Sequence, residues 1–279
     1  MILIADSGST KTDWVLVDRD KNQSYYHTIG YNPYFVDSET IYDSLSKKLI
    51  NQFDPSCIKK VLFYGAGCSQ ESKSNVVNNA LTKCFTNAEI IVDHDMLAAA
   101  RALLGDQRGF AAILGTGSNT CIYDGKQIEK NIDSLGYLLG DEGSGSYIAK
   151  KIIRDFMRGR LPGELQEKFQ RTYNLTNSNI FDALYNGLAP NKFLAGFCKF
   201  ADQNRKHKYI RRVVKESFND FFKNLVRLYP DYQKFKFNCA GSVGSIFKDQ
   251  LKEVAAAHGM QMGVIMPSPI INLVNYHTK

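Results

Sequence analysis

Short apolar runs alternate with amphipathic segments along much of the chain. The apolar or alternating runs of strand length cover residues 1–5, 14–18, 23–29, 60–64, 89–92, 110–114, 120–125, 126–131, 235–240 and 262–266. Helical spacing of apolar residues covers 41–49, 69–85, 96–104, 146–157, 245–258 and 270–277. Strands followed by helices in this order predict an α/β fold in which crossover connections join mostly parallel strands.

Residues 146–232 differ from the rest because their pattern is mainly helical. Within them, apolar residues recur at helical spacing from Val213 to Leu228 and form a wide stripe. A stripe of this width is typical of a helix that packs on a core. We therefore interpret its aromatic residues as core residues and not as a platform for stacked bases.

The stretch Asp6-Ser7-Gly8-Ser9-Thr10-Lys11-Thr12-Asp13 joins the first two apolar runs and predicts a β-hairpin. Its small residues let backbone N–H groups approach an anion, and Ser9, Thr10 and Lys11 add donors and a positive charge. A phosphate beside the Asp6 carboxylate makes sense when a Mg²⁺ ion lies between them. The spacing is not that of a P-loop. By itself, the turn is interpreted equally well as an ordinary polar hairpin.

Three later stretches have a related character. After the strand at 110–114, Gly115-Thr116-Gly117-Ser118-Asn119 leads into a second strand, so that each half of the chain begins with such a hairpin. This repetition suggests two related domains that face one nucleotide. The acidic pair in Gly140-Asp141-Glu142-Gly143-Ser144-Gly145 precedes a helix and has more glycines around it than capping requires. Strand, turn and helix also follow one another around Gly241-Ser242-Val243-Gly244, which is a weak signal for nucleotide contact.

Together these stretches resemble a known superfamily. The turns at 6–13 and 115–119 are similar to the phosphate-1 and phosphate-2 loops of the actin/Hsp70/sugar-kinase superfamily. Residues 140–144 resemble the Gly-Asp-Glu-Gly-Ser motif of the N-acetylglucosamine kinase branch, which is grouped with the BadF/BadG/BcrA/BcrD ATPases. The resemblance spans nearly the whole chain. It implies two ribonuclease-H-like (actin-like ATPase) domains with an interdomain cleft, roughly 1–109 with 265–279, and 110–264 with a helical insertion.

The resemblance also implies that ATP and Mg²⁺ are cofactors and that an amino sugar is the substrate. The implied phosphate ligands are Gly8, Ser9, Thr10, Lys11, Gly115, Thr116 and Gly117. Asp6 is expected near the metal, directly or through water. The implied sugar contacts are Asn32, Ser118, Asn119, Gly136 and Asp141, with ordering of the metal shell as an alternative role for Asp141. The residues that match the adenosine motif are Gly241, Ser242 and Gly244.

The catalytic base is expected in Asp93-His94-Asp95, which follows a strand and precedes an alanine-rich helix. Either aspartate also suits the N-cap of that helix, which is the purely structural alternative. In the resembling kinases the base is an aspartate just before this helix, and Asp95 fits that position best, with Asp93 as the second choice. A helix N-terminus stabilises an ionised carboxylate, which suits phosphoryl transfer because the base takes its proton late.

The implied reaction transfers the γ-phosphoryl group of ATP to a hydroxyl of N-acetylglucosamine or glucosamine. Two other functions stay open: a BadF-type ATPase that activates a partner enzyme, and a non-catalytic sugar sensor. The related activators hold an iron–sulfur cluster between subunits, which the scattered cysteines of this chain disfavour. A repressor-type sensor usually carries an N-terminal helix-turn-helix, whereas Met1 here begins the first strand.

Composition changes this picture little. The 279 residues are 44% hydrophobic and 23% charged, with a net charge of +7, which is typical of a globular protein. The densest basic run, 205–212, leads into a helical pattern and favours a solvated helix start over a nucleic-acid surface. The six cysteines form no C-x-x-C pair, which indicates reduced thiols and a cytoplasmic location. We see neither a signal peptide nor an apolar run of about 18 residues, so no membrane contact is expected; a homodimer stays open.

Overall fold

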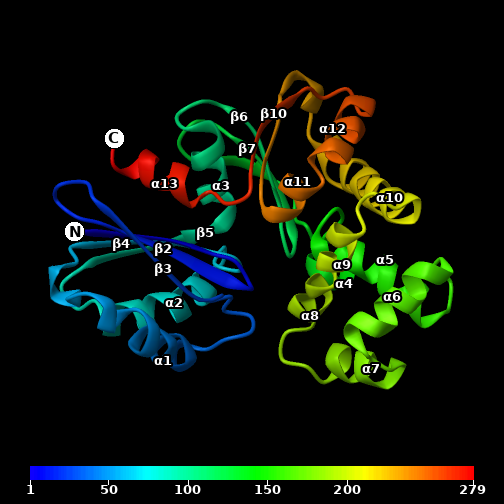
Figure 1. Ribbon diagram of the computed structural model, residues 1–279. Helices are drawn as coiled ribbons and strands as arrows, with labels where there is room; N and C mark the ends of the chain where they lie inside the picture. Colours follow the sequence, from blue (N-terminus) through cyan, green and yellow to red (C-terminus); the bar gives the residue numbers. More distant parts are fainter. The chain divides into compact units, whose positions relative to one another are not determined.

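The computed structural model describes residues 1–279, which divide into two compact units. The N-terminal unit consists of residues 1–108, 123–128 and 268–279. The C-terminal unit consists of residues 109–122 and 129–267. Each unit is built around one five-stranded sheet that carries helices (Figure 1).

The sheet of the N-terminal unit has the strand order β3-β2-β1-β4-β5. Its strands are β1 (Ile2–Ser7), β2 (Lys11–Val17), β3 (Gln23–Ile29), β4 (Lys60–Gly65) and β5 (Glu89–His94). The hairpin strands pair antiparallel, while β1, β4 and β5 run parallel to one another. The predicted hairpin at 6–13 and the predicted parallel crossovers are therefore confirmed for this sheet.

Two helices cover each face of this sheet (Figure 1). On one face lie α1 (Ser38–Lys48) and α2 (Glu71–Cys84), and on the other lie α3 (Asp95–Leu104) and α13 (Ile270–His277). The core below α1 and α2 is aromatic: the Trp14 ring lies 5.8 Å from Phe63 and 6.4 Å from Tyr31, centroid to centroid. The Trp14 Nε1 donates to Thr28 Oγ1 at 2.9 Å, so the one polar atom of the indole is satisfied inside the core.

Helix α13 brings the end of the chain onto the N-terminal unit, where it packs against α3, β1 and β2. The predicted helix at 270–277 is confirmed. Asn272 Nδ2 donates to the Ala102 carbonyl of α3 at 3.1 Å. The hydroxyl of Tyr64 joins the two helices, because it accepts from Arg101 at 2.6 Å and contacts His277 Nε2 at 2.8 Å.

The sheet of the C-terminal unit has the strand order β10-β9-β6-β7-β8. Its strands are β6 (Gly109–Leu114), β7 (Ser118–Tyr123), β8 (Ile128–Asn131), β9 (Phe237–Ala240) and β10 (Met262–Met266). Strand β9 lies parallel to both β6 and β10, although it follows β6 by more than a hundred residues. The intervening chain is helical, as predicted for residues 146–232.

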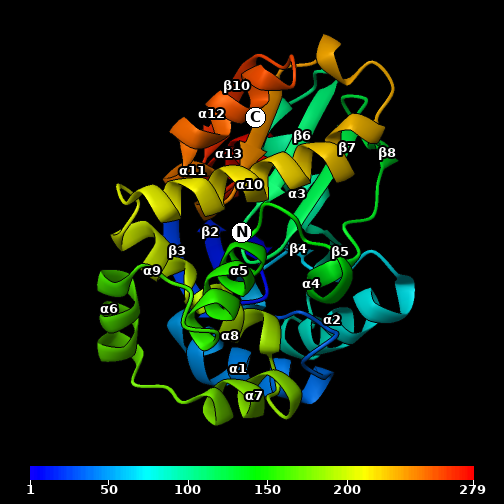
Figure 2. The ribbon, with the colours of Figure 1, turned by 90° about the vertical axis from the view of Figure 1, so that its right-hand side faces the viewer.

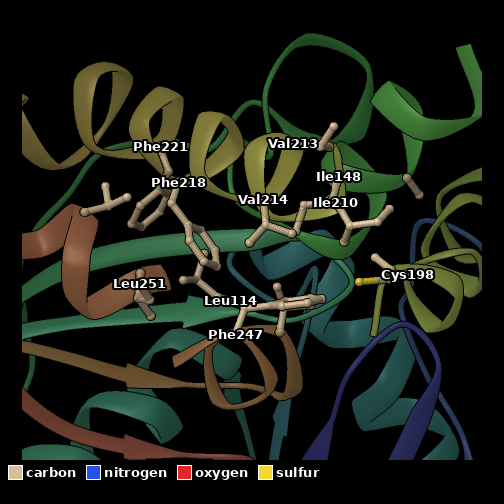
Figure 3. Packing of buried hydrophobic residues seen from close by; sticks show 14 of the residues in the cluster. Leu114, Ile148, Cys198, Ile210, Val213, Val214, Phe218, Phe221, Phe247 and Leu251 are labelled. Carbon is tan, nitrogen blue, oxygen red and sulfur yellow. The ribbon is translucent and has the colours of Figure 1, made fainter. Parts of the chain in front are cut away.

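The helices of this insertion are α4 (Gly136–Leu139), α5 (Gly145–Met157), α6 (Gly163–Tyr173), α7 (Asn177–Tyr185), α8 (Pro190–Gly196), α9 (Cys198–Gln203) and α10 (Lys208–Asn224). Short 3₁₀ helices lie at 50–52, 55–57, 226–228 and 232–234. The apolar stripe predicted along α10 is buried, including Val214, Phe218 and Phe221, which face Leu114 of β6 (Figure 3). The interpretation of its aromatic residues as core is confirmed.

One helix predicted from the sequence differs in the structure, and one helix of the structure was not predicted. The single helix predicted over 245–258 is wrong, because the chain forms α11 (Ser242–Ile246) and α12 (Lys248–Ala257), with α12 beside α10 (Figure 2). The break falls at Phe247, whose ring is buried in the core and whose backbone leaves the helical region at φ −104° and ψ 31°. The short helix α4 was not predicted. No helix of the chain combines the length and the apolar character that a bilayer crossing requires.

We predict that Tyr64→Phe lowers the free energy of unfolding by about 1–3 kcal/mol, because it leaves the half-buried Arg101 guanidinium without this acceptor. Burial lowers the pKa of His277 to about 4, so its neutral ring also loses a partner at pH 7. Chemical denaturation measures the change. Tyr25→Phe is the control, since this side chain is 52% exposed and its loss should change the free energy by less than about 0.5 kcal/mol. Equal effects of the two substitutions would refute the role of Tyr64.

Candidate functional site

The first glycine-rich loop, residues 8–10, joins β1 to β2. The Gly8 N–H donates to the Lys11 carbonyl at 3.0 Å, and the Gly30 N–H donates to the Thr10 carbonyl at 3.2 Å. Gly30 supports the loop so closely that a Cβ there would lie 2.3 Å from the Gly8 oxygen. A Cβ on Gly8 itself would meet only the Lys11 carbonyl, at 3.8 Å. The neighbours of Gly8 therefore do not require a glycine, and its exposed side leaves room for a ligand.

The Lys11 ammonium group lies against a buried carboxylate. Its Nζ is 2.8 Å from Asp13 Oδ2, and His27 Nδ1 is 2.8 Å from Asp13 Oδ1. Asp13 and His27 are paired across β2 and β3, so all three side chains share one face of the sheet. We had not assigned Asp13 and His27 to the site from the sequence. The spacing of two residues between Lys11 and Asp13 on a strand was the available signal.

Asp6 and Asp95 both belong to the N-terminal unit, and the charge of Asp95 acts on Asp6. Asp6 lies near the end of β1, and Asp95 is the first residue of α3. Burial, followed by the charges of Asp95 and Asp13, raises the pKa of Asp6 to about 7, against a smaller opposing effect of Lys11. Burial also raises the pKa of Asp95. Two carboxyl groups held together in this way attract a proton or a cation.

The capping alternative for these aspartates is not what the structure has. The N-cap of α3 is His94, which makes no side-chain capping bond. The Asp93 carboxylate accepts the backbone N–H of His94 at 3.1 Å, one residue away. Asp95 is therefore the aspartate whose charge acts directly on Asp6.

Asn32 connects the first loop to the turn that follows β3. Its Nδ2 donates to Ser9 Oγ at 2.9 Å, while its Oδ1 accepts the backbone N–H of Tyr34 at 3.0 Å. The amide is thus held in one orientation by two partners of opposite type. Its second N–H remains available to a hydroxyl in this arrangement.

The second glycine-rich loop, residues 115–117, joins β6 to β7 and lies among the other glycine-rich stretches of the C-terminal unit. The Gly145 N–H at the start of α5 donates to the Gly115 carbonyl at 2.8 Å. On the other side, a Cβ on Gly241 would lie 2.3 Å from the Leu114 oxygen, and its φ of +122° also requires glycine. Gly115 itself has no neighbour within 4 Å of a Cβ position. Three motifs far apart in sequence thus meet around one strand end.

Asp141 lies behind the second loop. It adopts a left-handed backbone conformation, φ 58°, and its side chain is 7% exposed. The Ser118 N–H donates to its Oδ1 at 3.0 Å. Burial raises the pKa of Asp141 to about 6, while the bond from Ser118 and the charge of Lys150 lower it. A Cβ on Gly117 would lie 3.0 Å from both Asp141 oxygens, so Gly117 is a glycine at least partly because of Asp141.

The remaining residues predicted to contact the sugar or the adenosine have surroundings that do not by themselves indicate a binding site. Asn119 Oδ1 accepts from Asn131 Nδ2 at 2.9 Å, which ties it to β8. Gly136 begins α4 with open space around its Cβ position. Ser242 is exposed at the start of α11, whereas a Cβ on Gly244 would lie 2.6 Å from the Cys239 sulfur, which is a packing reason for that glycine.

Comparison with known proteins agrees with this geometry. The model of the BadF/BadG/BcrA/BcrD ATPase family matches residues 5–216. The structure of a candidate N-acetylglucosamine kinase from Porphyromonas gingivalis is similar to this chain at 39% identity and a TM-score of 0.93, covering 99% of this chain and 98% of that one. No protein of curated function matches the chain.

More distant structures share the fold. A candidate N-acetylglucosamine kinase from Chromobacterium violaceum has 14% identity and a TM-score of 0.75, covering 99% of this chain and 98% of that one. A ROK family glucokinase from Streptomyces griseus, in complex with glucose and AMPPNP, has 14% identity and a TM-score of 0.59, covering 99% of this chain and 97% of that one. These similarities confirm the predicted α/β fold of the actin-like ATPase type.

We predict that Gly8→Ala and Gly115→Ala each weaken ATP binding at least about tenfold, because a methyl group would occupy space that the protein leaves open beside each loop. The fold should survive, since neither methyl group meets a close neighbour. Calorimetric titration measures the affinity. Gly163→Ala is the matched control, because its Cβ position at the start of α6 is equally open. Unchanged ATP affinity in Gly115→Ala would mean that the second loop does not contact the nucleotide.

We predict that Asp6→Asn stabilises the ligand-free protein clearly more at pH 8 than at pH 5. The pKa of Asp6 is raised from 3.8 to about 7 in the folded protein, so folding is progressively disfavoured as pH rises between these values. The amide carries no charge and avoids this loss. In thermal melts, the increase in Tm should be at least about 3 °C larger at pH 8 than at pH 5. The same shift at both pH values would contradict the raised pKa of Asp6.

Proposed function

Because the chain belongs to the BadF/BadG/BcrA/BcrD ATPase family, we propose that it is an ATP-dependent kinase that phosphorylates a hydroxyl of an amino sugar. N-acetylglucosamine is the first candidate and glucosamine the second, supported by the Porphyromonas gingivalis protein at 39% identity, itself described as a candidate N-acetylglucosamine kinase. The observation that carries the proposal is the interaction of the Asp95 charge with Asp6, which lies near the end of β1 just before the first glycine-rich loop. In this proposal, Asp95 is the base and Asp6 is the metal-binding carboxylate that precedes the phosphate-binding turn.

Asp95 acts as the catalytic base in this proposal. Burial raises its pKa, which makes the carboxylate a better proton acceptor than an exposed aspartate. Its position at the start of α3 keeps the ionised form accessible, since the helix N-terminus favours negative charge. In a loose transition state, the base orients the sugar hydroxyl and takes its proton late.

The two glycine-rich loops bind the phosphates of ATP. In the N-terminal unit, the donors are the backbone N–H groups of residues 8–10 and the side chains of Ser9, Thr10 and Lys11. In the C-terminal unit, residues 115–117 take the corresponding role. Gly241 and its turn, with Ser242 and Gly244, contact the adenosine, which is supported by the position of this turn against the Leu114 carbonyl.

The carboxyl groups of Asp6 and Asp95 are suitable ligands for Mg²⁺. No group of three or more side chains of the ligand types His, Cys, Asp and Glu is assembled anywhere in the chain. That is compatible with Mg²⁺, which keeps most of its waters and binds through one or two carboxylates and the substrate phosphates. Asp6 would hold the ion, directly or through water. Bound Mg²⁺ would supply positive charge to the β- and γ-phosphates and would offset the repulsion between Asp6 and Asp95.

In this proposal, each unit offers polar groups that suit a sugar. Asn32 offers its remaining N–H, and Asp141 offers a buried carboxylate that accepts hydroxyl hydrogens. The sequence also assigns three other residues of the C-terminal unit to the sugar contacts: Ser118, Asn119 and Gly136. A site of buried polar groups discriminates strongly against substrates that leave those groups unpaired.

The activator function is disfavoured by the cysteines. Cys68, Cys84, Cys121, Cys198 and Cys239 are all buried, and only Cys57 is exposed. An iron–sulfur cluster between subunits needs thiolates on an accessible surface. The buried thiols also support a cytoplasmic location, where cysteines stay reduced.

We predict that N-acetylglucosamine or glucosamine raises ATP consumption well above its basal rate. Asp95→Asn should lower this sugar-dependent turnover by about 10²–10⁴, because the amide keeps the shape of the side chain but accepts no proton. ATP affinity should change little. A coupled assay of ADP release, run with a panel of amino sugars and hexoses, measures both effects.

Asp93→Asn tests the alternative base and should retain most of the turnover, because the Asp93 carboxylate is engaged with the His94 backbone. An inactive Asp93→Asn beside an active Asp95→Asn would move the base to Asp93. An ATPase rate that no sugar changes, but that a partner protein raises, would favour the activator function.

A further inference from the structure

The segment 134–140, which we call the α4 turn, makes few interactions that would stabilise its position. Helix α4 is only four residues long, and an isolated helix of this length is not stable in water. Leu135, Leu138 and Leu139 are 59%, 75% and 80% exposed. Leu135 also adopts a left-handed conformation, φ 60°, which is unfavourable for leucine. Hydrophobic burial therefore anchors the α4 turn through Tyr137, which packs partly against the core, and hardly through its leucines.

Lys150 of α5 supplies a polar anchor for this turn. Its Nζ donates to the Tyr137 carbonyl at 2.5 Å. Further hydrogen bonds of the turn are local, within residues 133–141: Leu135 N–H to Asp133 Oδ1 at 3.0 Å, Gly140 N–H to the Gly136 carbonyl at 2.8 Å and Asp141 N–H to the Ser134 carbonyl at 2.9 Å. The bond from Lys150 thus fixes the turn to the long helix α5.

The same ammonium group also interacts electrostatically with Asp141 and Glu142. The charge of Lys150 lowers the pKa of Asp141, and both Asp141 and Glu142 act in turn on Lys150. Lys150 Nζ also lies 5.2 Å from the centre of the Tyr147 ring, one turn earlier on α5, which restricts where the long side chain can go. One cation therefore bonds the α4 turn and acts electrostatically on Asp141.

We propose that Lys150 is a positioning residue for the sugar substrate: its ammonium group bonds the Tyr137 carbonyl and so holds the α4 turn, which contains Gly136 and leads into Asp141, in place on α5. This inference rests on the proposed function, in which Gly136 and Asp141 contact the sugar. Without Lys150, the α4 turn keeps its other hydrogen bonds, including that from the Asp141 N–H, but loses its bond to α5. Sugar binding should then weaken, while ATP binding at the glycine-rich loops is left intact.

The test compares Lys150→Met with Lys151→Met in the full-length protein. Lys151 is the matched control, because it is the next residue of the same helix and its Nζ bonds Asp220 of α10 at 2.9 Å, not the α4 turn. Lys150→Met should raise the KM for N-acetylglucosamine at least about tenfold and leave the KM for ATP within about twofold of wild type. Lys151→Met should leave both constants near their wild-type values. Thermal melts of both variants report whether the fold is retained.

Equal KM values for the sugar in Lys150→Met and Lys151→Met would overturn the inference, as would a parallel rise in the KM for ATP. If Lys150→Met does not fold, Lys150→Gln is the second variant. Its side chain is uncharged and shorter than that of lysine, so the same rise in the KM for the sugar is expected. The proposed function fails separately, when the wild-type protein shows no sugar-dependent turnover. A sugar-dependent wild type with an unaffected Lys150→Met refutes only the role of Lys150.

Discussion

Close backbone packing at the end of β6 is the constraint on which the C-terminal unit depends. The Leu114 and Gly115 carbonyls have backbone against them from two sides, since Gly145 N–H bonds one and Gly241 leaves no room for a Cβ beside the other. A side chain at Gly241 would force apart β6 and the start of α11. The same packing brings the stretches at 115, 145 and 241 to one place, so the architecture of this unit and its candidate ligand contacts have a common origin.

The N-terminal unit is organised by a different balance, between burial and like charge. The charge of Asp95, at the start of α3, acts on Asp6, near the end of β1. The network of Tyr64, Arg101 and His277 fixes α3 to the C-terminal helix. Such a pair of carboxyl groups destabilises the empty protein at neutral pH and becomes favourable when a cation is present. Local instability of this kind is common at functional sites. In this account it explains why an unfavourable arrangement is retained.

Much of the fold follows from the sequence, because the strong patterns are local. The hairpin at 6–13 and the stripe on α10 were predicted correctly, since alternation and helical spacing report directly which face is buried. The helix at 245–258 was not, because a continuous helical pattern does not reveal that Phe247 must turn into the core. Helix α4 gives almost no signal, as its leucines are exposed. The motifs indicated candidate site residues. The contact of Gly117 with Asp141 and the pairing of Asp13 with His27 across two strands depend on tertiary structure that no local pattern contains.

Phosphoryl transfer to a sugar, as distinct from ATP hydrolysis, is the central claim, and analysis of the products tests it most directly. The protein is incubated with ATP, Mg²⁺ and N-acetylglucosamine, and the phosphorus-containing products are followed by ³¹P NMR. The account predicts a sugar monophosphate that accumulates in step with ADP, with little inorganic phosphate. ADP accompanied by an equal amount of inorganic phosphate, without a sugar phosphate from any amino sugar tried, would contradict it.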